Sequence, residues 1–255
     1  MKYVAFLDVL GFRSMVDRST HEKLARVYQN AFITNATYSL SNGKVIPVST
    51  ASGEFVTADL SNPLTSCLIV SDSVILWTEN ASMLSFVNIF STVGKILVSV
   101  FYTGLPMRGG IAVGELSMLS QAPSQTGKVS IQSVFGKALT HAYEIESKQE
   151  WAGCAISQDC IDQYKSESGK YVGNVPELAT LDYLKSEKTL VRYPVPIKHN
   201  QSEEMWVVNW AKFNRDSIST DTVSSAFTKH NKETDNATVQ TKIRNTLAFL
   251  EHVNA

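Results

Sequence analysis

The sequence predicts an α+β protein: a ferredoxin-like sandwich with a mixed, mostly antiparallel sheet, helices on one face and a helical appendage at the C-terminus. Two observations predict this class. Short runs rich in strand-forming residues alternate with amphipathic helical segments, and two of the runs flank a tight polar turn, as in a β-hairpin. Their order is strand, helix, hairpin, helix, strand, helix, strand, which is typical of a sheet covered by helices.

The first half of the chain supplies the first strand, a helix and the hairpin. The expected elements are a strand over 2–7, a helix over 20–40, a loop or small hairpin over 44–63 and a hairpin over 66–78. Asp8 ends the first strand, and Asn42-Gly43 ends the helix because both residues accept left-handed dihedrals. Ser71-Asp72-Ser73 separates two apolar runs, which predicts a hairpin with an acidic turn.

The second half continues with helices and strands and then becomes polar. The expected elements are helices over 81–103 and 136–148, strands over 107–116, 152–156, 189–197 and 205–210, a polar linker or lid over 216–235 and an amphipathic helix over 237–253. The helix over 81–103 is apolar nearly all round, so a sheet and a partner subunit are expected to cover it. We therefore expect a main domain over 1–215, with its motifs in 3–150, and a linker plus helix over 216–255.

Composition excludes some classes of function. Hydrophobic residues make up 44% of the 255 residues and charged residues 18%, as in folded proteins with a full core. The net charge of −1 argues against a nucleic-acid or anionic-membrane binder. The run before Asp8 is too short for a signal peptide, polar residues interrupt the apolar stretch 83–102, and three cysteines lack zinc-site spacing. We expect a cytoplasmic protein without direct membrane association.

Asp8 and Asp72 are the candidate catalytic and metal-binding residues. In a ferredoxin-like sheet the first strand is central and lies beside the hairpin, so the two carboxylates are expected to converge at one sheet edge. Two close carboxylates repel each other unless a cation neutralises them, and hard oxygen ligands select Mg²⁺ or Mn²⁺. After Asp8, Gly11 lets the chain turn closely, and the amides of Leu10, Gly11, Phe12 and Arg13 are expected to bind phosphate at a helix N-terminus.

Four segments resemble the motifs of class III nucleotidyl cyclases, in the order of that family. They are FLDVLGF (6–12), SDSVILW (71–77), MRGGIAVGE (107–115) and VFGKALTHAYEIES (134–147), which together span roughly residues 3–150. The resemblance implies a class III cyclase sandwich. It also implies two divalent ions, Mn²⁺ or Mg²⁺, held by Asp8, the carbonyl of Val9, and Asp72.

The form of these motifs is most similar to the bacterial pyrimidine cyclases of the Pycsar antiphage system. That resemblance implies a phosphorus–oxygen lyase that converts UTP to 3′,5′-cyclic UMP and diphosphate. It further implies a homodimer with active sites at the interface, and a product that acts as a second messenger on a separate effector protein.

The sequence also departs from the purine-cyclase pattern. Leu68 stands where adenylate and guanylate cyclases read the base, and Ser133 occupies the second base-reading position. Thr140 and Glu144 replace the transition-state Asn and Arg of the family helix. These losses are compatible with a pyrimidine base. Ser133 and Thr140 remain candidate contacts to the base or the transition state, and the candidates to replace the lost Arg are Arg13, Arg108 and Lys137. For Arg108 a purely structural pairing within the strand is an equal alternative.

Three other functions remain open. A cytidylate cyclase that converts CTP to cyclic CMP would use the same residues. A degenerate cyclase fold that senses nucleotides without catalysis would explain the missing Asn and Arg. A nucleotidyltransferase or diguanylate-cyclase-like enzyme would place a metal-binding hairpin on a similar sheet, but it would normally carry a GG[D/E]EF turn, and Ser71-Asp72-Ser73 is different.

Overall fold

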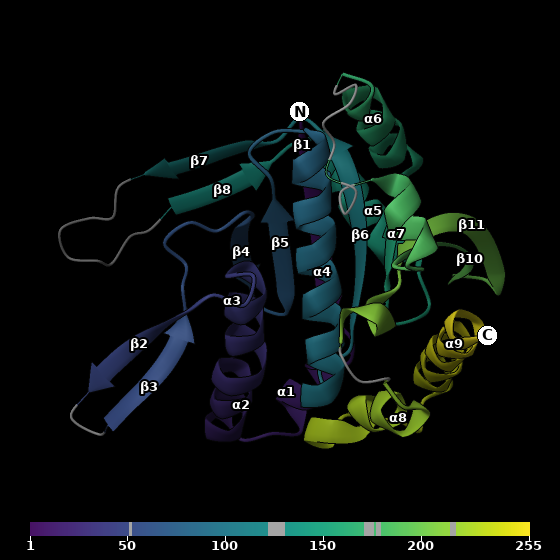
Figure 1. Ribbon diagram of the computed structural model, residues 1–255. Helices are drawn as coiled ribbons and strands as arrows, with labels where there is room; N and C mark the ends of the chain where they lie inside the picture. Colours follow the sequence, from purple (N-terminus) through teal and green to yellow (C-terminus); the bar gives the residue numbers. More distant parts are fainter. Residues whose placement is uncertain (51–52, 122–130, 171–175, 177–179, 215–217) are drawn as a thin grey trace.

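A seven-stranded sheet forms the middle layer of the computed structural model, which describes residues 1–50, 53–121, 131–170, 176, 180–214 and 218–255 (Figure 1). Its strands are β1 (Lys2–Val9), β4 (Ser66–Val70), β5 (Ser73–Trp77), β6 (Met107–Gly114), β9 (Cys154–Ile156), β10 (Leu190–Ile197) and β11 (Gln201–Val208). They lie in the order β10-β11-β9-β6-β1-β5-β4. β1 is antiparallel to β5 and β6, whereas β6 and β9 are parallel. The α+β class, the mixed sheet and the ferredoxin-like order β6-β1-β5-β4 are as predicted.

One face of the sheet is covered by the helices that connect the strands of this half. They are α2 (His21–Val27), the π-helix η1 (Tyr28–Ile33), α3 (Thr34–Leu40) and α4 (Met83–Thr103). The ring of Tyr3 on β1 meets that of Phe86 on α4 with a centroid distance of 5.4 Å. Of the described helices, α4 alone is long and apolar enough to cross a membrane, but Phe90 and Phe101 pack against rings inside the protein. It is a core helix.

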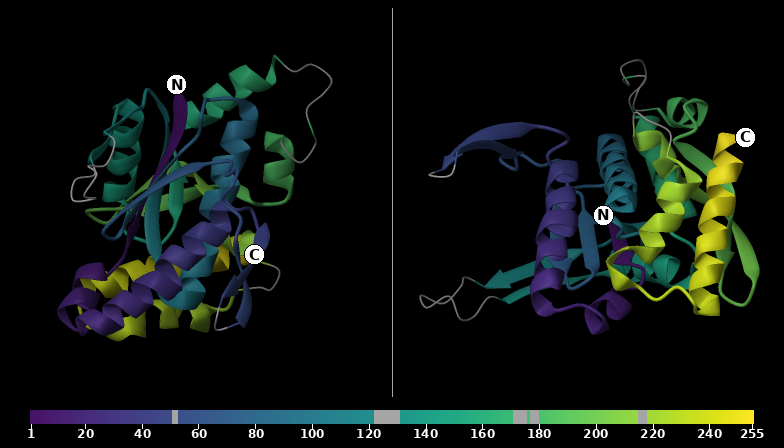
Figure 2. Two further views of the ribbon diagram at one scale, coloured as in Figure 1. Left: turned by 90° about the vertical axis from the view of Figure 1, so that its left-hand side faces the viewer. Right: turned by 90° about the horizontal axis from the view of Figure 1, so that it is seen from below.

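The opposite face of the sheet is covered by α5 (Lys137–Lys148) (Figure 2). Helices were expected on one face, and the structure has this helix on the other face as well. Side chains alternate along a strand, so Tyr3 and Phe6 point to opposite faces of β1. Phe6 meets Tyr143 of α5 edge-on at 5.4 Å. A Cβ at Gly110 on β6 would lie 2.4 Å from the carbonyl oxygen of Ala142, so glycine is needed for this close packing. The α5 face is the one toward which Asp8 points, two residues after Phe6.

Two β-hairpins extend from the same side of the molecule (Figures 1 and 2). They are β2 (Val45–Thr50) with β3 (Gly53–Ala58), and β7 (Ser117–Gln121) with β8 (Ile131–Phe135). The first corresponds to the small hairpin expected over 44–63, whereas the second was not predicted. Both expose large apolar side chains, among them Val45, Phe55, Val56, Met118, Leu119, Ile131 and Phe135.

The C-terminal segment is part of the main core. The polar linker expected over 216–235 contains α8 (Thr220–Thr228), which buries Val223, Ala226 and Phe227. The linker interpretation failed there because three apolar residues at helical spacing suffice to bury one face. α9 (Ala237–Asn254) packs Phe249 against Trp151, with a centroid distance of 4.7 Å. The remaining described helices are α1 (Phe12–Asp17), α6 (Gln158–Ser168), α7 (Leu181–Ser186), η3 (Trp210–Phe213) and η4 (Lys229–Asn231).

Gly110→Ala is predicted to destabilise the protein by about 1–3 kcal/mol, because the new methyl group would push α5 away from β6. Gly114→Ala, on the same strand, is the matched control: its nearest neighbour would lie 3.3 Å away, so we expect a loss below about 1 kcal/mol. The free energy of unfolding in urea measures both. Equal losses in the two variants would contradict the close packing at Gly110.

Candidate active site

Asp8 lies in a row of three side chains that crosses neighbouring strands. Its register partners are Ser73 on β5 and Arg108 on β6. Residues directly opposite each other in antiparallel strands share a face, so all three side chains stand on the α5 side of the sheet. The Ser73 hydroxyl donates a hydrogen bond of 2.9 Å to Oδ1 of Asp8 and fixes the orientation of the carboxylate.

The hairpin turn brings Asp72 to the end of β1. The backbone N–H of Val9 donates to the carbonyl oxygen of Asp72 at 3.1 Å, and the Tyr28 hydroxyl donates to the carbonyl of Ser71. Burial raises the pKa of Asp8 to about 6, with further upward contributions from the charges of Asp72 and Glu146; the Ser73 hydrogen bond and Arg108 act in the opposite direction. The carboxyl of Asp8 is therefore held in a site that disfavours its negative charge.

Such a site matches the chemistry of a hard divalent cation. A cation next to Asp8 would remove the penalty of a partly buried carboxylate beside a second acid. The described residues contain no cluster of three or more His, Cys, Asp or Glu side chains suited to metal. Mg²⁺ usually binds through one or two carboxylates plus substrate phosphates, so Asp8, Asp72 and the Val9 carbonyl are a suitable donor set.

The turn after Asp8 differs in part from its prediction as a phosphate-binding loop. The Leu10 N–H donates to the carbonyl of Pro106 at 2.9 Å, so this amide is not available to phosphate. Gly11 has φ 79°, a left-handed conformation, and it precedes α1, whose first N–H groups have no intrahelical partner. The free amides of this turn are therefore those at the start of α1. The Arg13 side chain is almost fully exposed and lies 3.8 Å from Asp17.

Arg108 is engaged in a buried ion pair. Its Nε donates to Oε1 of Glu146 on α5 at 2.5 Å, and a second nitrogen donates to the carbonyl of Gln149 at 2.6 Å. Burial raises the pKa of Glu146, and Arg108 opposes that shift. The structural alternative for Arg108 is thus realised: it ties β6 to α5 next to Asp8.

The other predicted contacts do not reach Asp8 within one chain. The N–H of Ala138 bonds to the carbonyl of Glu115, so α5 begins at the far end of β6. Arg108 and Gly114 are six residues apart along that strand, or about 20 Å. Lys137 and Thr140 are exposed in the first turn of α5, and Ser133 is exposed on β8. These three residues therefore lie at the opposite end of the sheet from Asp8.

Sequence reasoning missed three residues around this site: Ser73, Glu146 and Lys232. Ser73 is adjacent to Asp72, so the hairpin register could have revealed it, whereas nothing local marks the other two. Lys232 is buried, and its Nζ donates to the carbonyls of Gly104 and Ala226, both at 2.7 Å. A Cβ at Gly11 would lie 3.0 Å from Cδ of this lysine, which therefore packs directly against the turn. Burial lowers the pKa of Lys232 to about 7.

No family model matches the chain, and no curated protein matches it in sequence. Among solved structures, the guanylyl cyclase Cya2 is similar, with 13% identity, 81% of this chain and 90% of that chain covered, and a TM-score of 0.49. The adenylyl cyclase CyaB from P. aeruginosa has 14% identity, 86% and 96% coverage and a TM-score of 0.48. The guanylate cyclase domain of RhGC from Catenaria anguillulae, in complex with GTP, has 11% identity, with 82% of this chain and 95% of that chain covered, and a TM-score of 0.47. These similarities are too distant to assign an activity.

Asp8→Asn is predicted to stabilise the metal-free protein by about 1–2 kcal/mol at pH 7.5. The pKa of Asp8 in the folded state, about 6, lies above its ordinary value of 3.8. The charged carboxylate therefore costs stability above pH 6, and this cost disappears as the pH falls from 6 towards 4. Asparagine still accepts the Ser73 hydrogen bond.

Urea unfolding in EDTA at pH 7.5 and pH 4.5 measures this effect. Asp17→Asn is the control, because that side chain is exposed and its ion pair is with the exposed Arg13. A destabilised Asp8→Asn protein, or an equal gain at both pH values, would contradict the assigned environment of Asp8.

Proposed function

We propose that the protein is a metal-dependent nucleotide cyclase that converts UTP to 3′,5′-cyclic UMP and diphosphate. The observation that carries this proposal is the position of the Asp72 turn at the end of β1, where the Val9 N–H donates a hydrogen bond of 3.1 Å to the backbone carbonyl of Asp72. The resemblance of the four sequence segments to class III cyclase motifs supports the reaction type.

The pyrimidine preference rests on what the base-reading positions offer. Leu68 lies on β4, half-buried and opposite Ile75, and its side chain has no group that could hydrogen-bond a purine. A site built to pair with a polar group rejects ligands that lack it, so the loss of those partners favours a different base. UTP is proposed over CTP only because uridylate cyclases are the more prevalent members of the family that the motifs resemble, and CTP remains the alternative substrate.

Each site residue has a proposed role. Asp8, Asp72 and the Val9 carbonyl would hold two divalent ions, and Ser73 keeps the Asp8 carboxylate oriented. The backbone N–H groups of Phe12 and Arg13 at the start of α1 donate hydrogen bonds to the phosphate oxygens. The Arg108–Glu146 pair holds α5 against β6 and so maintains the wall beside Asp8.

The reaction is an intramolecular displacement. The ribose 3′-oxygen forms a bond to the α-phosphorus as the bond to the diphosphate breaks, and the hydroxyl proton passes to solvent. Bound divalent metal would supply the positive charge that acidifies this hydroxyl and neutralises the leaving diphosphate. No side chain is then required as a general base. Asp8 and Asp72 act by position, because their carboxylates set where that charge is located.

A homodimer with shared active sites accounts for the residues at the two ends of the sheet. The start of α5, with Lys137 and Thr140, lies about 20 Å from Asp8 in one chain, and Ser133 lies on the β7–β8 hairpin. A head-to-tail partner related by a two-fold axis could bring its α5 start to the Asp8 edge. The exposed apolar side chains of the β2–β3 and β7–β8 hairpins offer a surface for this contact.

The proposed setting follows from the resemblance to the Pycsar cyclases. The enzyme would act in the cytoplasm, and cyclic UMP would serve as a second messenger that switches on a separate effector in antiphage defence.

The purified protein with Mn²⁺ is predicted to convert UTP, or CTP, to the 3′,5′-cyclic monophosphate, while ATP and GTP remain unchanged. Asp8→Asn and Asp72→Asn should each lower the rate by at least about 100-fold, because either change removes a metal ligand. Asp182→Asn, whose side chain is 98% exposed on α7, should keep full activity. Mass spectrometry of all four nucleotide reactions identifies the products.

Unchanged UTP and CTP would refute the cyclase. Tight, metal-dependent triphosphate binding without product would instead identify a non-catalytic nucleotide sensor, which is the second candidate because Arg108 is already paired with Glu146.

Leu119→Asp on the β7–β8 hairpin is predicted to weaken the dimer at least about tenfold, because it places a charge in an apolar contact. Ser120→Asp adds the same charge at the neighbouring exposed position and should weaken it less. Light scattering at micromolar concentration measures the mass. A monomeric wild-type protein would contradict the shared active site.

A further inference from the structure

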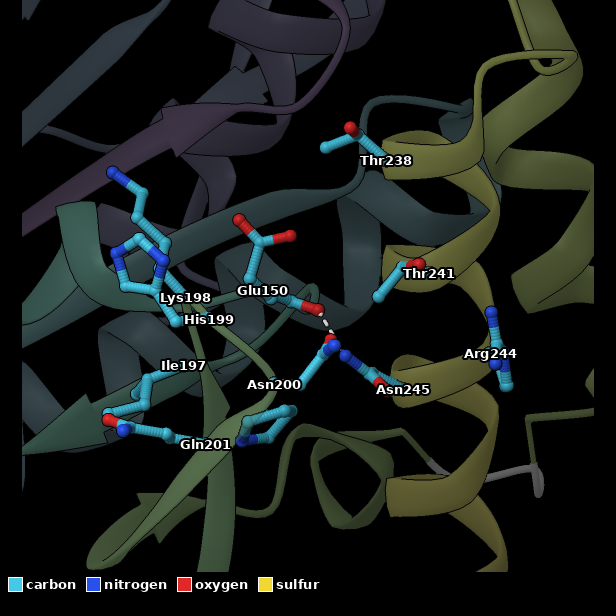
Figure 3. A pocket seen from close by; sticks show the side chains of 11 residues that line it. Glu150, Ile197, Lys198, His199, Asn200, Gln201, Thr238, Thr241, Arg244 and Asn245 are labelled. Carbon is cyan, nitrogen blue, oxygen red and sulfur yellow. Dashed lines mark hydrogen bonds between the residues drawn. The ribbon is translucent and has the colours of Figure 1, made fainter.

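A polar cavity lies between the β10–β11 turn and α9. It has a volume of about 720 Å³, within the size range of small-molecule sites. Its walls are the turn residues 198–201 on one side and the first half of α9 on the other, with Glu150 between them (Figure 3). None of the residues assigned to the proposed cyclase reaction lines this cavity.

The walls are held in place by contacts outside the cavity or at its base. The Asn245 side chain donates to the carbonyl of Glu150 at 2.8 Å, and Thr246 accepts the N–H of Ala152 at 2.8 Å. On the other wall, the Lys198 N–H donates to the carbonyl of Lys148 at 2.9 Å. α9 and the turn are therefore both anchored to the segment 148–152, and the cavity is preformed.

The turn itself has a left-handed backbone conformation. His199 and Asn200 are consecutive non-glycine residues with positive φ, 67° and 56°. The two residues lie in the tight turn of the β10–β11 hairpin, and consecutive positive φ values are typical of such turns. The side chains of both residues line the cavity (Figure 3). The turn thus keeps polar side chains where the backbone alone favours glycine.

Positive charge accumulates around the cavity. Lys198 and Arg244 line it, opposed by the carboxylate of Glu150. Lys198 and Arg244 outnumber Glu150 among the lining residues, so the charged side chains of the cavity carry a net positive charge. A phosphate monoester carries a charge of about −1.5 to −2 at pH 7, which is opposite in sign.

We propose that this cavity binds the phosphate group of a phosphorylated small molecule at a site separate from Asp8 and Asp72. Lys198 and Arg244 hold the phosphate, with the planar guanidinium of Arg244 as a bidentate donor. The amides of Asn200 and Gln201 bind the polar remainder of the ligand. The proposal does not depend on cyclase activity.

The test is isothermal titration of the full chain in EDTA with three probes: orthophosphate, diphosphate and UMP. At least one probe should bind saturably, and Arg244→Ala and Lys198→Ala should each weaken it about tenfold or more. Arg192→Ala is the control: it removes the same charge from β10, but Arg192 lies over the Trp206 ring, 5.3 Å from its centroid, outside the cavity. It should bind as the wild type does.

The three probes distinguish the sources of the phosphate. Tighter binding of UMP than of orthophosphate supports a nucleotide ligand, and equal binding supports recognition of the phosphate group alone. The absence of saturable binding by all three probes overturns the proposal, as does unchanged affinity in the Arg244 and Lys198 variants. Loss of binding in Asp8→Asn with retention in Arg244→Ala also overturns it, because the anion would then be bound at the sheet edge. EDTA makes each outcome independent of turnover.

Discussion

The position of β1 between two antiparallel neighbours determines most of what this protein places at its sheet edge. Because the strand is central, its register is fixed on both sides, with Ser73 opposite Asp8 on β5 and Arg108 opposite it on β6. A shift by one residue would turn Asp8 into the α4 core and Leu7 out of it. The buried residues of β1 on the α4 side therefore hold the orientation of one carboxylate on the other side.

The α5 face imposes a second constraint on the same carboxylate. Gly110 lets α5 approach β6 closely enough for Glu146 to meet Arg108. Arg108 is the cation next to Asp8, and it is paired with Glu146. Burial therefore remains the largest influence on the pKa of Asp8, which stays raised. The packing of α5 on β6 thus sets the charge environment of Asp8. A bound cation would neutralise the carboxylate in this environment.

The sequence allowed the sheet order and the positions of Asp8 on the first strand and Asp72 in the hairpin turn to be predicted, because they follow from local patterns. Apolar runs define the strands, and Ser71-Asp72-Ser73 defines the turn that places the second acid. The partner of the Leu10 amide, the side of the sheet taken by α5 and the role of Lys232 depend on contacts between residues far apart in the chain. Such contacts leave no periodic signal. The polar composition of 216–235 also concealed α8, whose buried face needs only three apolar residues.

The contact between Lys232 and Gly11 has a consequence for biosynthesis. A chain is made from its N-terminus, so β1, the hairpin and α4 can assemble while later residues are still being added. The turn at Gly11 gains its covering lysine, and α4 gains the ammonium that binds the Gly104 carbonyl, only after residue 232 has left the ribosome. The two acidic residues are therefore translated early, but the turn between Asp8 and α1 is covered only late in synthesis, and a shorter nascent chain lacks this contact.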